Sequence, residues 1–272
     1  MSVITGVGDD SSFFLPATGD APSTMSPELH IHDSAGALFE AAARRIIELG
    51  NEAIEQRGEF NLALAGGQTP RALYRCLGAP ALQPRLDWTR LQFWFGDERC
   101  VPPDHPDSNY RMARETLLEQ LPLDSRQFHR MEGELEPELA ARRYRDAMTQ
   151  LPRDGDGLPI FDLILLGLGA DGHIASLFPD TPASQLQEFT VAALHSPLHR
   201  HWRLSLTLPV INRARHLLLV VSGEKKADIL RHIFNRPPGA RPLPVQLLEP
   251  RGTLEWYIDR DAALLLPAGR GR

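Results

Sequence analysis

The sequence contains little cysteine, no basic excess and no long apolar run, and each absence argues against a class of protein. Cys76 and Cys100 are the only cysteines in 272 residues, and neither lies in a CxxC or Cys/His pattern. This usage indicates reduced, structural thiols in a cytoplasmic compartment. The formal net charge of −6 argues against a general nucleic-acid-binding or anionic-membrane surface. An anionic ligand would need a few focused cationic residues.

Membrane-spanning and secreted proteins are also disfavoured. No apolar run approaches the roughly 20 residues that a helix needs to cross a bilayer. The N-terminal stretch SSFFLP is too short for the apolar region of a signal peptide and follows no basic segment. Residues 1–28 are rich in Gly, Ser, Thr, Asp and Pro and lack periodicity, which predicts a flexible tail before a domain at residues 29–272. We expect a soluble, cytoplasmic protein.

Apolar runs that alternate with helical patterns predict the fold class. The strand candidates are the six apolar runs at residues 60–65, 91–95, 161–168, 189–194, 203–208 and 216–222. Helical spacing of apolar residues begins after Asp33 or Ser34, either of which suits an N-cap, and recurs at 70–77, 109–120, 137–150 and 224–234. This alternation predicts an α/β fold with a mostly parallel, Rossmann-like sheet, helices on both faces and a single domain. Ligands bind such sheets at the carboxyl ends of the strands.

The first candidate site is the turn formed by Gly66, Gly67, Gln68 and Thr69, which joins a strand candidate to a helix. Thr69 suits the N-cap of that helix, and Pro70 suits its first position. The glycines let a ligand approach the backbone, and the N–H groups of a helix N-terminus favour a phosphate or carboxylate. A plain tight turn is the alternative. The spacing fits neither a Walker A loop nor a dinucleotide fingerprint, so no nucleotide is implied.

Three charged residues, Asp97, Glu98 and Arg99, directly follow another apolar run. Charges grouped at the end of a buried strand indicate mutual pairing or contact with a ligand, and the alternative is a surface ion-pair cluster. The next segment, VPPDHPDSN, is stiffened by three prolines, and Ser108 suits the N-cap of the following helix. We expect His105 in this loop to be merely exposed.

The stretch FDLILLGLGADGHIASLFP contains the most informative histidine. An apolar strand ends in three glycines within six residues, so His173 lies at the mouth of a central strand. An unperturbed imidazole, with a pKa near roughly 6.5, is mostly unprotonated at neutral pH, as a general base requires. Asp171 and Ser176 are near enough in sequence to orient the ring. A structural histidine in a turn is the alternative.

Further basic residues lie at other predicted strand ends. Arg203 opens RLSLTL, and Lys225 and Lys226 lie where a strand passes into a helix. Cations at these positions would supply the focused positive field that an acidic chain otherwise lacks. The alternative for each is a solvated surface charge.

Two common kinds of enzyme site are not indicated. His195, His199 and His201 in HSPLHRHW have no accompanying cysteine or suitably spaced carboxylate, and no HExxH motif occurs, so a metal site is not expected there. No GxSxG motif indicates a nucleophilic serine.

Together these stretches resemble the 6-phosphogluconolactonase family, part of the glucosamine-6-phosphate isomerase/6-phosphogluconolactonase superfamily. The resemblance covers residues from about 30 to 266 and rests on AGGQTP, GDERCVPPDHPDSNYRM, FDLILLGLGADGHIASLFP, RLSLTLPVINRARHLLLVVSGEKKADIL and LEWYIDRDAALLL. Glucosamine-6-phosphate deaminases look similar but continue Asp-Gly-His with Ile-Ala-Phe-Asn-Glu-Pro, whereas this chain continues with IASLFPD. Ala65 stands where the family usually has serine, so no serine hydroxyl contact is implied.

The resemblance implies hydrolysis of 6-phospho-D-glucono-1,5-lactone to 6-phospho-D-gluconate in the oxidative pentose phosphate pathway, with no metal or other cofactor. It implies that His173 activates water. Arg99 is the candidate that faces the developing oxyanion, although it suits the phosphate equally well, and Asp97 would orient Arg99 or the water. The implied phosphate contacts are Gly66, Gly67, Gln68, Thr69, Arg203 and Lys226.

Two other functions remain open on the sequence. A glucosamine-6-phosphate deaminase or isomerase would need a second acid/base carboxylate, and a non-catalytic sugar-phosphate-binding protein would need only the phosphate contacts. No strongly apolar stripe is left over once the helices cover the sheet, so we expect a monomer. No nucleic-acid or membrane partner is expected.

Overall fold

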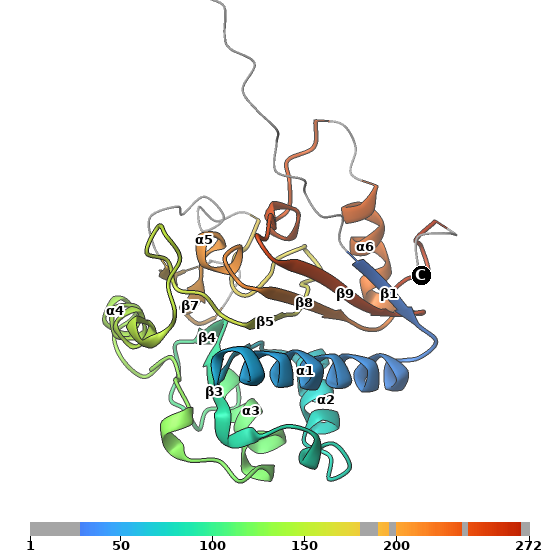
Figure 1. Ribbon diagram of the computed structural model, residues 1–272. Helices are drawn as coiled ribbons and strands as arrows, with labels where there is room; N and C mark the ends of the chain where they lie inside the picture. Colours follow the sequence, from blue (N-terminus) through green and yellow to red (C-terminus); the bar gives the residue numbers. More distant parts are fainter. Residues whose placement is uncertain (1–27, 180–189, 196–199, 236–238, 268–272) are drawn as a thin grey trace, which may run out of the picture.

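The computed structural model describes residues 28–179, 190–195, 200–235 and 239–267, and a six-stranded parallel sheet lies at its centre (Figure 1). The strand order is β1-β9-β8-β5-β2-β3, and every neighbouring pair is parallel. The strand bounds are β1 Glu28–His32, β2 Phe60–Leu64, β3 Leu91–Phe95, β5 Leu163–Leu166, β8 His216–Val221 and β9 Thr253–Asp259. The predicted α/β class with a mostly parallel sheet is confirmed.

The apolar runs predict four neighbouring strands of this sheet, β8, β5, β2 and β3. The other two, β1 and β9, were not among the candidates. Every residue of β2 and β5 is buried, as expected for strands covered on both faces. β1 and β9 carry polar residues such as His30, Glu255 and Asp259, which interrupt any apolar run. β1 begins at Glu28, so the last residue of the predicted tail belongs to the sheet. Residues 1–27 lie outside the described residues.

A second, antiparallel sheet of three strands adjoins the first, in the order β4-β7-β6. Its strands are β4 Asp97–Arg99, β6 Val191–Leu194 and β7 Arg203–Leu206. The sequence predicts the last two as members of a mostly parallel sheet, but they pair antiparallel because the link at 195–202 is shorter than the dozen or so residues of a parallel crossover. Gly96 joins the two sheets: its N–H donates to Leu64 O at 2.8 Å, and its carbonyl accepts from Leu206 N at 2.8 Å.

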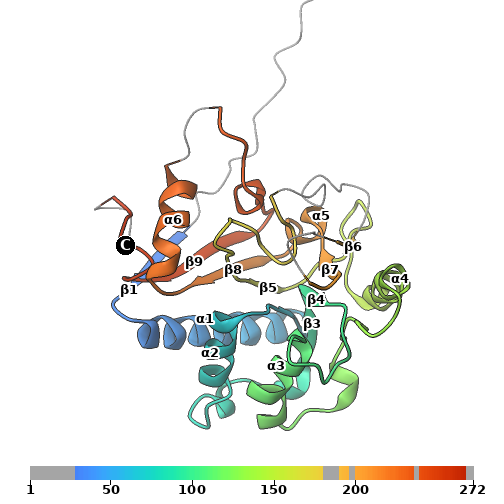
Figure 2. The ribbon, with the colours of Figure 1, turned by 180° about the vertical axis from the view of Figure 1, so that it is seen from behind.

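Helices cover both faces of the large sheet, as the sequence predicts. They are α1 Ala35–Arg57, α2 Gln68–Leu77, α3 Asn109–Thr116, α4 Pro137–Ala147, α5 Leu208–Ile211 and α6 Ala227–Phe234. The chain crosses the sheet in one direction through β1, β2 and β3 and in the other through β5, β8 and β9. Because parallel crossovers are right-handed, the helices of these two halves lie on opposite faces. Figures 1 and 2 show α1 and α2 on one side and α6 on the other.

Two predicted helix caps are confirmed and one is wrong. Ser34 caps α1 by accepting from Ala37 N at 3.3 Å, and Ser108 caps α3 by accepting from Arg111 N at 3.1 Å. Thr69 does not cap α2. The N-cap is Gly67, whose φ of 103° turns the chain before the position expected. The amide groups of the first turn of α2 therefore receive no side-chain cap.

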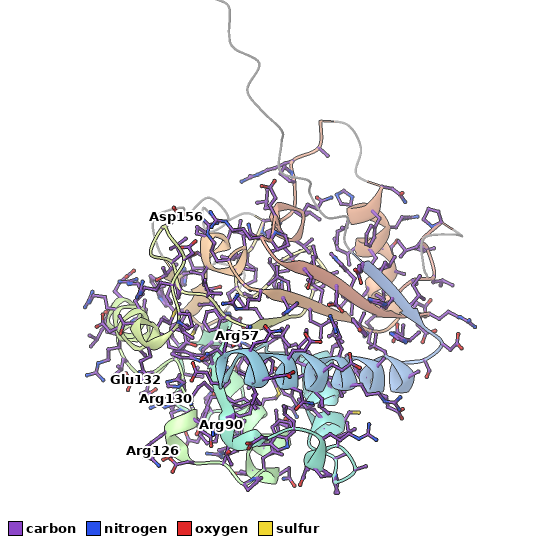
Figure 3. All side chains as sticks on the ribbon, in the orientation of Figure 1. Arg57, Arg90, Arg126, Arg130, Glu132 and Asp156 are labelled. Atoms are coloured by element: carbon purple, nitrogen blue, oxygen red, sulfur yellow. The ribbon has the colours of Figure 1, made fainter. Side chains whose placement is uncertain are left out.

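The amino ends of the strands are held by a buried carboxylate. Asp162 accepts from Asn61 N at 2.8 Å and from Arg57 Nε at 2.9 Å. Arg57 lies in the last turn of α1, against the sheet (Figure 3).

In the part of the chain that the structure describes, no helix combines the length and the apolarity needed to cross a membrane.

Two buried tyrosines fix the carboxyl ends of neighbouring strands. Tyr74 Oη accepts from Ala65 N and donates to Ala65 O, both at 2.8 Å. Tyr144 Oη accepts from Phe95 N at 2.8 Å and donates to Phe95 O at 3.0 Å. Each hydroxyl thus satisfies two backbone groups that lie just beyond or at the end of a strand. These hydroxyls fix where β2 and β3 pass into their loops.

Replacing Tyr74 by phenylalanine is expected to lower the free energy of unfolding by about 1–3 kcal/mol, because it leaves a buried N–H and C=O of Ala65 unpaired. Urea denaturation of wild type and variant measures this. Tyr110→Phe is the matched control, since that hydroxyl bonds to none of the described residues. Equal stability of the two variants would contradict the role assigned to the Tyr74 hydroxyl.

Candidate active site

A cleft of about 930 Å³ lies at the carboxyl ends of β2, β3, β5 and β8. This is the edge at which parallel sheets bind ligands, and the volume suits a small molecule. All nine site residues that the sequence predicts line the cleft: Gly66, Gly67, Gln68, Thr69, Asp97, Arg99, His173, Arg203 and Lys226. Residues from five separate segments of the chain therefore meet in one place.

The glycine turn brings the backbone unusually close to α3. A Cβ atom at Gly66 would lie 2.1 Å from Asn109 Oδ1, so a side chain at this position would collide with the asparagine. Gly67 has a positive φ of 103° and directly precedes α2. The N-terminus of α2, with its uncapped amides and the positive end of the helix dipole, thereby faces the cleft, an arrangement that favours an anion.

Asp97 is buried and is held by two side chains other than Arg99. Its Oδ2 accepts from Ser176 Oγ at 2.6 Å, and its Oδ1 accepts from Asn109 Nδ2 at 3.1 Å. The described hydrogen bonds of the Asp97 side chain do not include Arg99, and the expectation that Asp97 orients Arg99 or the water stays a prediction. Of the two residues expected to be near enough to orient His173, Asp171 bonds to the ring, whereas the Ser176 hydroxyl donates to Asp97. These bonds fix the Asp97 carboxylate at the cleft wall.

Glu98 explains why a third charge lies beside Asp97. Its buried carboxylate accepts from the backbone N–H groups of Arg99 (2.7 Å), Asn109 (2.7 Å) and Tyr110 (2.8 Å), and from Ser108 Oγ (3.0 Å). Burial raises the pKa of Glu98, while the three backbone donors act in the opposite direction. Glu98 thus anchors the N-terminus of α3 and does not reach the cleft lining.

Arg99 and Arg203 face each other across the β4–β7 pair. Arg99 Nη1 donates to Asp107 O at 2.7 Å. Arg99 Nε and Arg203 Nη1 are both buried without a hydrogen-bond partner among the described residues. Burial lowers the pKa of Arg203, and the neighbouring Arg99 lowers it further. Two like charges with unpaired buried donors are costly in the absence of an anion, so this pair indicates an anion site.

Lys226 also lines the cleft, from the 3₁₀ turn Glu224–Lys226 that precedes α6. Its Nζ donates to Leu168 O at 2.7 Å. Burial lowers the pKa of Lys226, and the negative charge of Asp171 opposes that shift. Lys226 is therefore the partly buried lysine of the pair predicted from the sequence, whereas Lys225 is exposed.

His173 is oriented by a carboxylate. Its Nδ1 lies 2.6 Å from Asp171 Oδ1, which leaves Nε2 as the nitrogen available to a substrate or water. The ring also lies 4.7 Å, centroid to centroid, from Phe178. A Cβ at Gly169 would lie 2.1 Å from Nδ1, so glycine is needed for the ring to adopt this position. Burial alone would raise the pKa of Asp171, but the hydrogen bond and charge of His173 lower it to about 2.

Sequence reasoning missed Asn109. This residue contacts the glycine turn, donates to the Asp97 side chain and to Asp97 O at 2.9 Å, and donates its N–H to Glu98. Its place directly after the helix cap Ser108 was the available signal. The sequence identifies Ser108 as a cap, but no local pattern shows that the Asn109 side chain contacts the glycine turn some 40 residues earlier.

Comparisons with known proteins agree with this architecture. A family model described as "Glucosamine-6-phosphate isomerases/6-phosphogluconolactonase" matches residues 33–256. The 6-phosphogluconolactonase of Synechocystis sp. is 37% identical over 240 residues, which cover 88% of this chain and 98% of the relative. That of Mycobacterium tuberculosis is 36% identical over 252 residues, which cover 90% of this chain and 100% of the relative.

Solved structures show the same fold. The devB protein superposes with a TM-score of 0.82 at 33% identity, over 89% of this chain and 100% of its own. The 6-phosphogluconolactonase from Trypanosoma cruzi has a TM-score of 0.78 at 28% identity, over 90% of this chain and 98% of its own. With the matched model spanning most of the domain, the chain belongs to the glucosamine-6-phosphate isomerase/6-phosphogluconolactonase family.

Proposed function

We propose that this protein hydrolyses 6-phospho-D-glucono-1,5-lactone to 6-phospho-D-gluconate, the lactonase step of the oxidative pentose phosphate pathway. The observation that carries the proposal is a single cleft that holds both a carboxylate-oriented imidazole, His173, and two guanidinium groups, of which Arg99 Nε and Arg203 Nη1 have no partner among the described residues. The relatives named 6-phosphogluconolactonase support this choice of substrate. The expected monomer and cytoplasmic location stay predictions from the sequence.

In the proposed reaction His173 acts as a general base. Nε2 removes a proton from water while the water oxygen attacks the lactone carbonyl carbon, and the carbonyl electron pair moves onto its oxygen. The tetrahedral intermediate then collapses, the bond between C1 and the ring oxygen breaks, and the imidazolium returns the proton to that oxygen. Asp171 accepts from Nδ1–H, so it stabilises the imidazolium and keeps Nε2 facing the reacting water.

The phosphate group is assigned to the N-terminus of α2, Arg203 and Lys226. The turn from Gly66 to Thr69 offers amides, Arg203 offers a buried N–H without a partner among the described residues, and Lys226 offers a partly buried ammonium. A dianion satisfies all three, because charge-assisted hydrogen bonds to phosphate are among the strongest in proteins.

Arg99 is assigned to the carbonyl oxygen that becomes an oxyanion. Its Nε is unpaired within the described part of the chain, while Nη1 is fixed on the carbonyl of Asp107. A preorganised cation of this kind stabilises charge that develops only in the transition state. Asp97, held by Ser176 and Asn109, is then available to accept a hydrogen bond from the water or the sugar.

His173→Ala is expected to lower the rate of lactone hydrolysis about 10²- to 10⁴-fold, because it removes the general base. The lactone is generated in situ, and its decay is followed above the spontaneous background at slightly acid pH. His195→Ala, a histidine outside the cleft lining, is the matched control and should retain wild-type activity.

Three outcomes would contradict the proposal or part of it. Full activity in His173→Ala would retain the function and exclude the assigned base. If wild type leaves the background rate unchanged and releases ammonia from glucosamine 6-phosphate, the protein is a deaminase. Binding of sugar phosphates without any turnover would make it a non-catalytic binding protein.

Substitutions of Arg203 and Arg99 are expected to change different steady-state parameters. Arg203→Ala should raise KM about 10- to 100-fold with a smaller change in kcat, because it removes a charged hydrogen bond to the phosphate. Arg99→Ala should lower kcat about 10²- to 10³-fold with little change in KM, because its contact forms with the oxyanion. Arg215→Ala, an arginine at the other end of the sheet, is the control. The reverse pattern would assign Arg99 to the phosphate.

The Asp171–His173 pair predicts a pH dependence of stability. An aspartate has an unfolded pKa of about 3.9, and that of Asp171 is lowered to about 2 in the folded protein. The ionised carboxylate therefore stabilises the fold above about pH 4, and this contribution is lost as the pH falls towards 2. The difference in free energy of unfolding between wild type and Asp171→Asn should shrink over this range in urea titrations. Asp261→Asn, an exposed aspartate, should show no such trend.

A further inference from the structure

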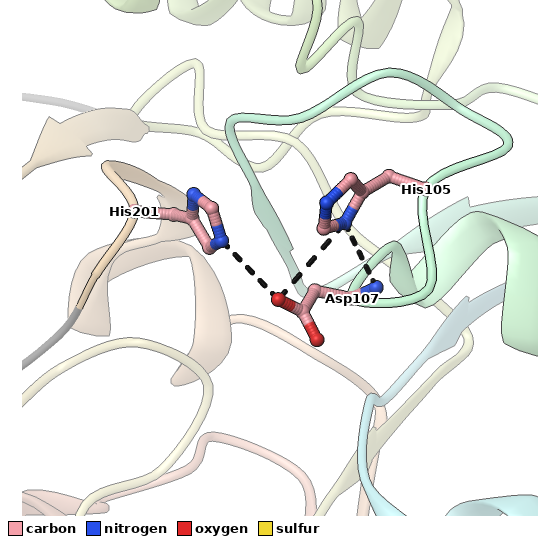
Figure 4. A group of neighbouring side chains, drawn as sticks. All are labelled: His105, Asp107 and His201. Carbon is pink, nitrogen blue, oxygen red and sulfur yellow. Dashed lines mark hydrogen bonds and ion pairs between the residues drawn. The ribbon is translucent and has the colours of Figure 1, made fainter.

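A second cluster of side chains lies outside the cleft lining. It consists of His105 and Asp107, from the loop between β4 and α3, and His201, two residues before β7 (Figure 4). His201 Nε2 lies 3.2 Å from Asp107 Oδ2, and His105 Nδ1 lies 3.9 Å from the same oxygen. One nitrogen or oxygen from each residue falls within 4.8 Å of the others. Three metal-ligating groups thus converge on one point from two segments.

We propose that His105, Asp107 and His201 bind a divalent transition-metal ion of the zinc class. Two imidazoles and one carboxylate are a common zinc donor set that leaves a fourth position to water. Donors at ~2.0–2.1 Å from a tetrahedral ion are roughly 3.3 Å apart. The observed separations, which reach at most 4.8 Å, therefore require the half-buried histidines and the exposed Asp107 to move towards one another.

Metal binding would exchange two hydrogen bonds of these side chains for metal–ligand bonds. Asp107 N donates to His105 Nδ1 at 3.1 Å, so that nitrogen carries a lone pair, and a metal bound there would displace the Asp107 N–H. His201 Nε2 shares its proton with Asp107 Oδ2. A metal would replace that proton, as metal binding does when ligands must be deprotonated. The side chains remain accessible, with 34% of His105, 50% of Asp107 and 19% of His201 exposed.

The loop that carries two of the ligands is preorganised. His105 N donates to Pro102 O and Ser108 N to His105 O, both at 3.0 Å, and Arg99 Nη1 holds the carbonyl of Asp107. Cys100 N donates to Trp202 O at 2.8 Å, which ties the loop to the segment that carries His201. An ion here would join the same two segments through metal–ligand bonds.

Two contacts of this cluster were not expected from the sequence. His105 is not merely exposed, since its ring lies 5.6 Å, centroid to centroid, from that of His201. His201 does have a carboxylate partner, but Asp107 lies 94 residues earlier, where a search for local spacing does not find it. His195 instead packs against Trp202, and His199 lies outside the described residues. The proposed hydrolysis assigns no step to this cluster, although Arg99, which it does use, donates to the carbonyl of Asp107.

The test is Zn²⁺ binding by tag-free, chelator-treated protein, measured by titration calorimetry, with Co²⁺ absorption as a report on coordination. Wild type should bind one equivalent at this site and gain thermal stability. Asp107→Asn and His201→Asn should each weaken binding by at least about tenfold and lose that gain. His195→Asn is the matched control and should bind as wild type does.

Other results would overturn the proposal. These are no Zn²⁺ binding by wild type, or unchanged binding in both variants. Loss of binding in His173→Ala but not in His201→Asn would place the ion on the Asp171–His173 pair instead. His105→Asn provides an independent ligand variant should either of the first two fail to fold, and metal-free thermal unfolding identifies such a failure.

Discussion

The hydrogen bonds of the buried Glu98 carboxylate are the interactions on which the cleft at the strand ends depends. The carboxylate gathers three backbone amides and a serine hydroxyl from β4 and α3, and this fixes the position of Asn109. Asn109 in turn holds Asp97 and packs against Gly66. An ionised or neutral carboxylate buried without such donors would be strongly destabilising, so the site and the fold share one set of hydrogen bonds.

The small antiparallel sheet supplies the two arginines of the cleft, which the parallel sheet does not contain. Its β4–β7 pairing places Arg99 opposite Arg203, and the parallel sheet contributes His173 and the helix N-terminus from its own strand ends. The chain as a whole is acidic, yet the cleft concentrates cations, and within the described part of the chain Arg99 Nε and Arg203 Nη1 have no hydrogen-bond partner. Such a local field attracts an anion without making the rest of the surface basic.

Much of this arrangement is predictable from sequence because it is encoded locally. Fully buried strands such as β2 and β5 appear as unbroken apolar runs, and the glycines before His173 mark a strand exit. β1 and β9 escaped prediction because polar residues such as His30 and Glu255 interrupt their apolar pattern. The contacts of Asp97 with Ser176 and of His201 with Asp107 escaped it because the partners lie 79 and 94 residues apart in sequence, and only the fold brings them together.

The close approach of Gly66 and Asn109 has a consequence for how this sequence can vary. The space that a Cβ at position 66 would need is filled by the asparagine side chain, and that side chain is committed to Asp97 and its backbone. Neither position can change alone without loss: a larger residue at 66 expels the asparagine, and a smaller residue at 109 leaves Asp97 short of a donor. Sequence changes at Gly66 and at Asn109 are therefore coupled, and a substitution at one position requires a compensating substitution at the other.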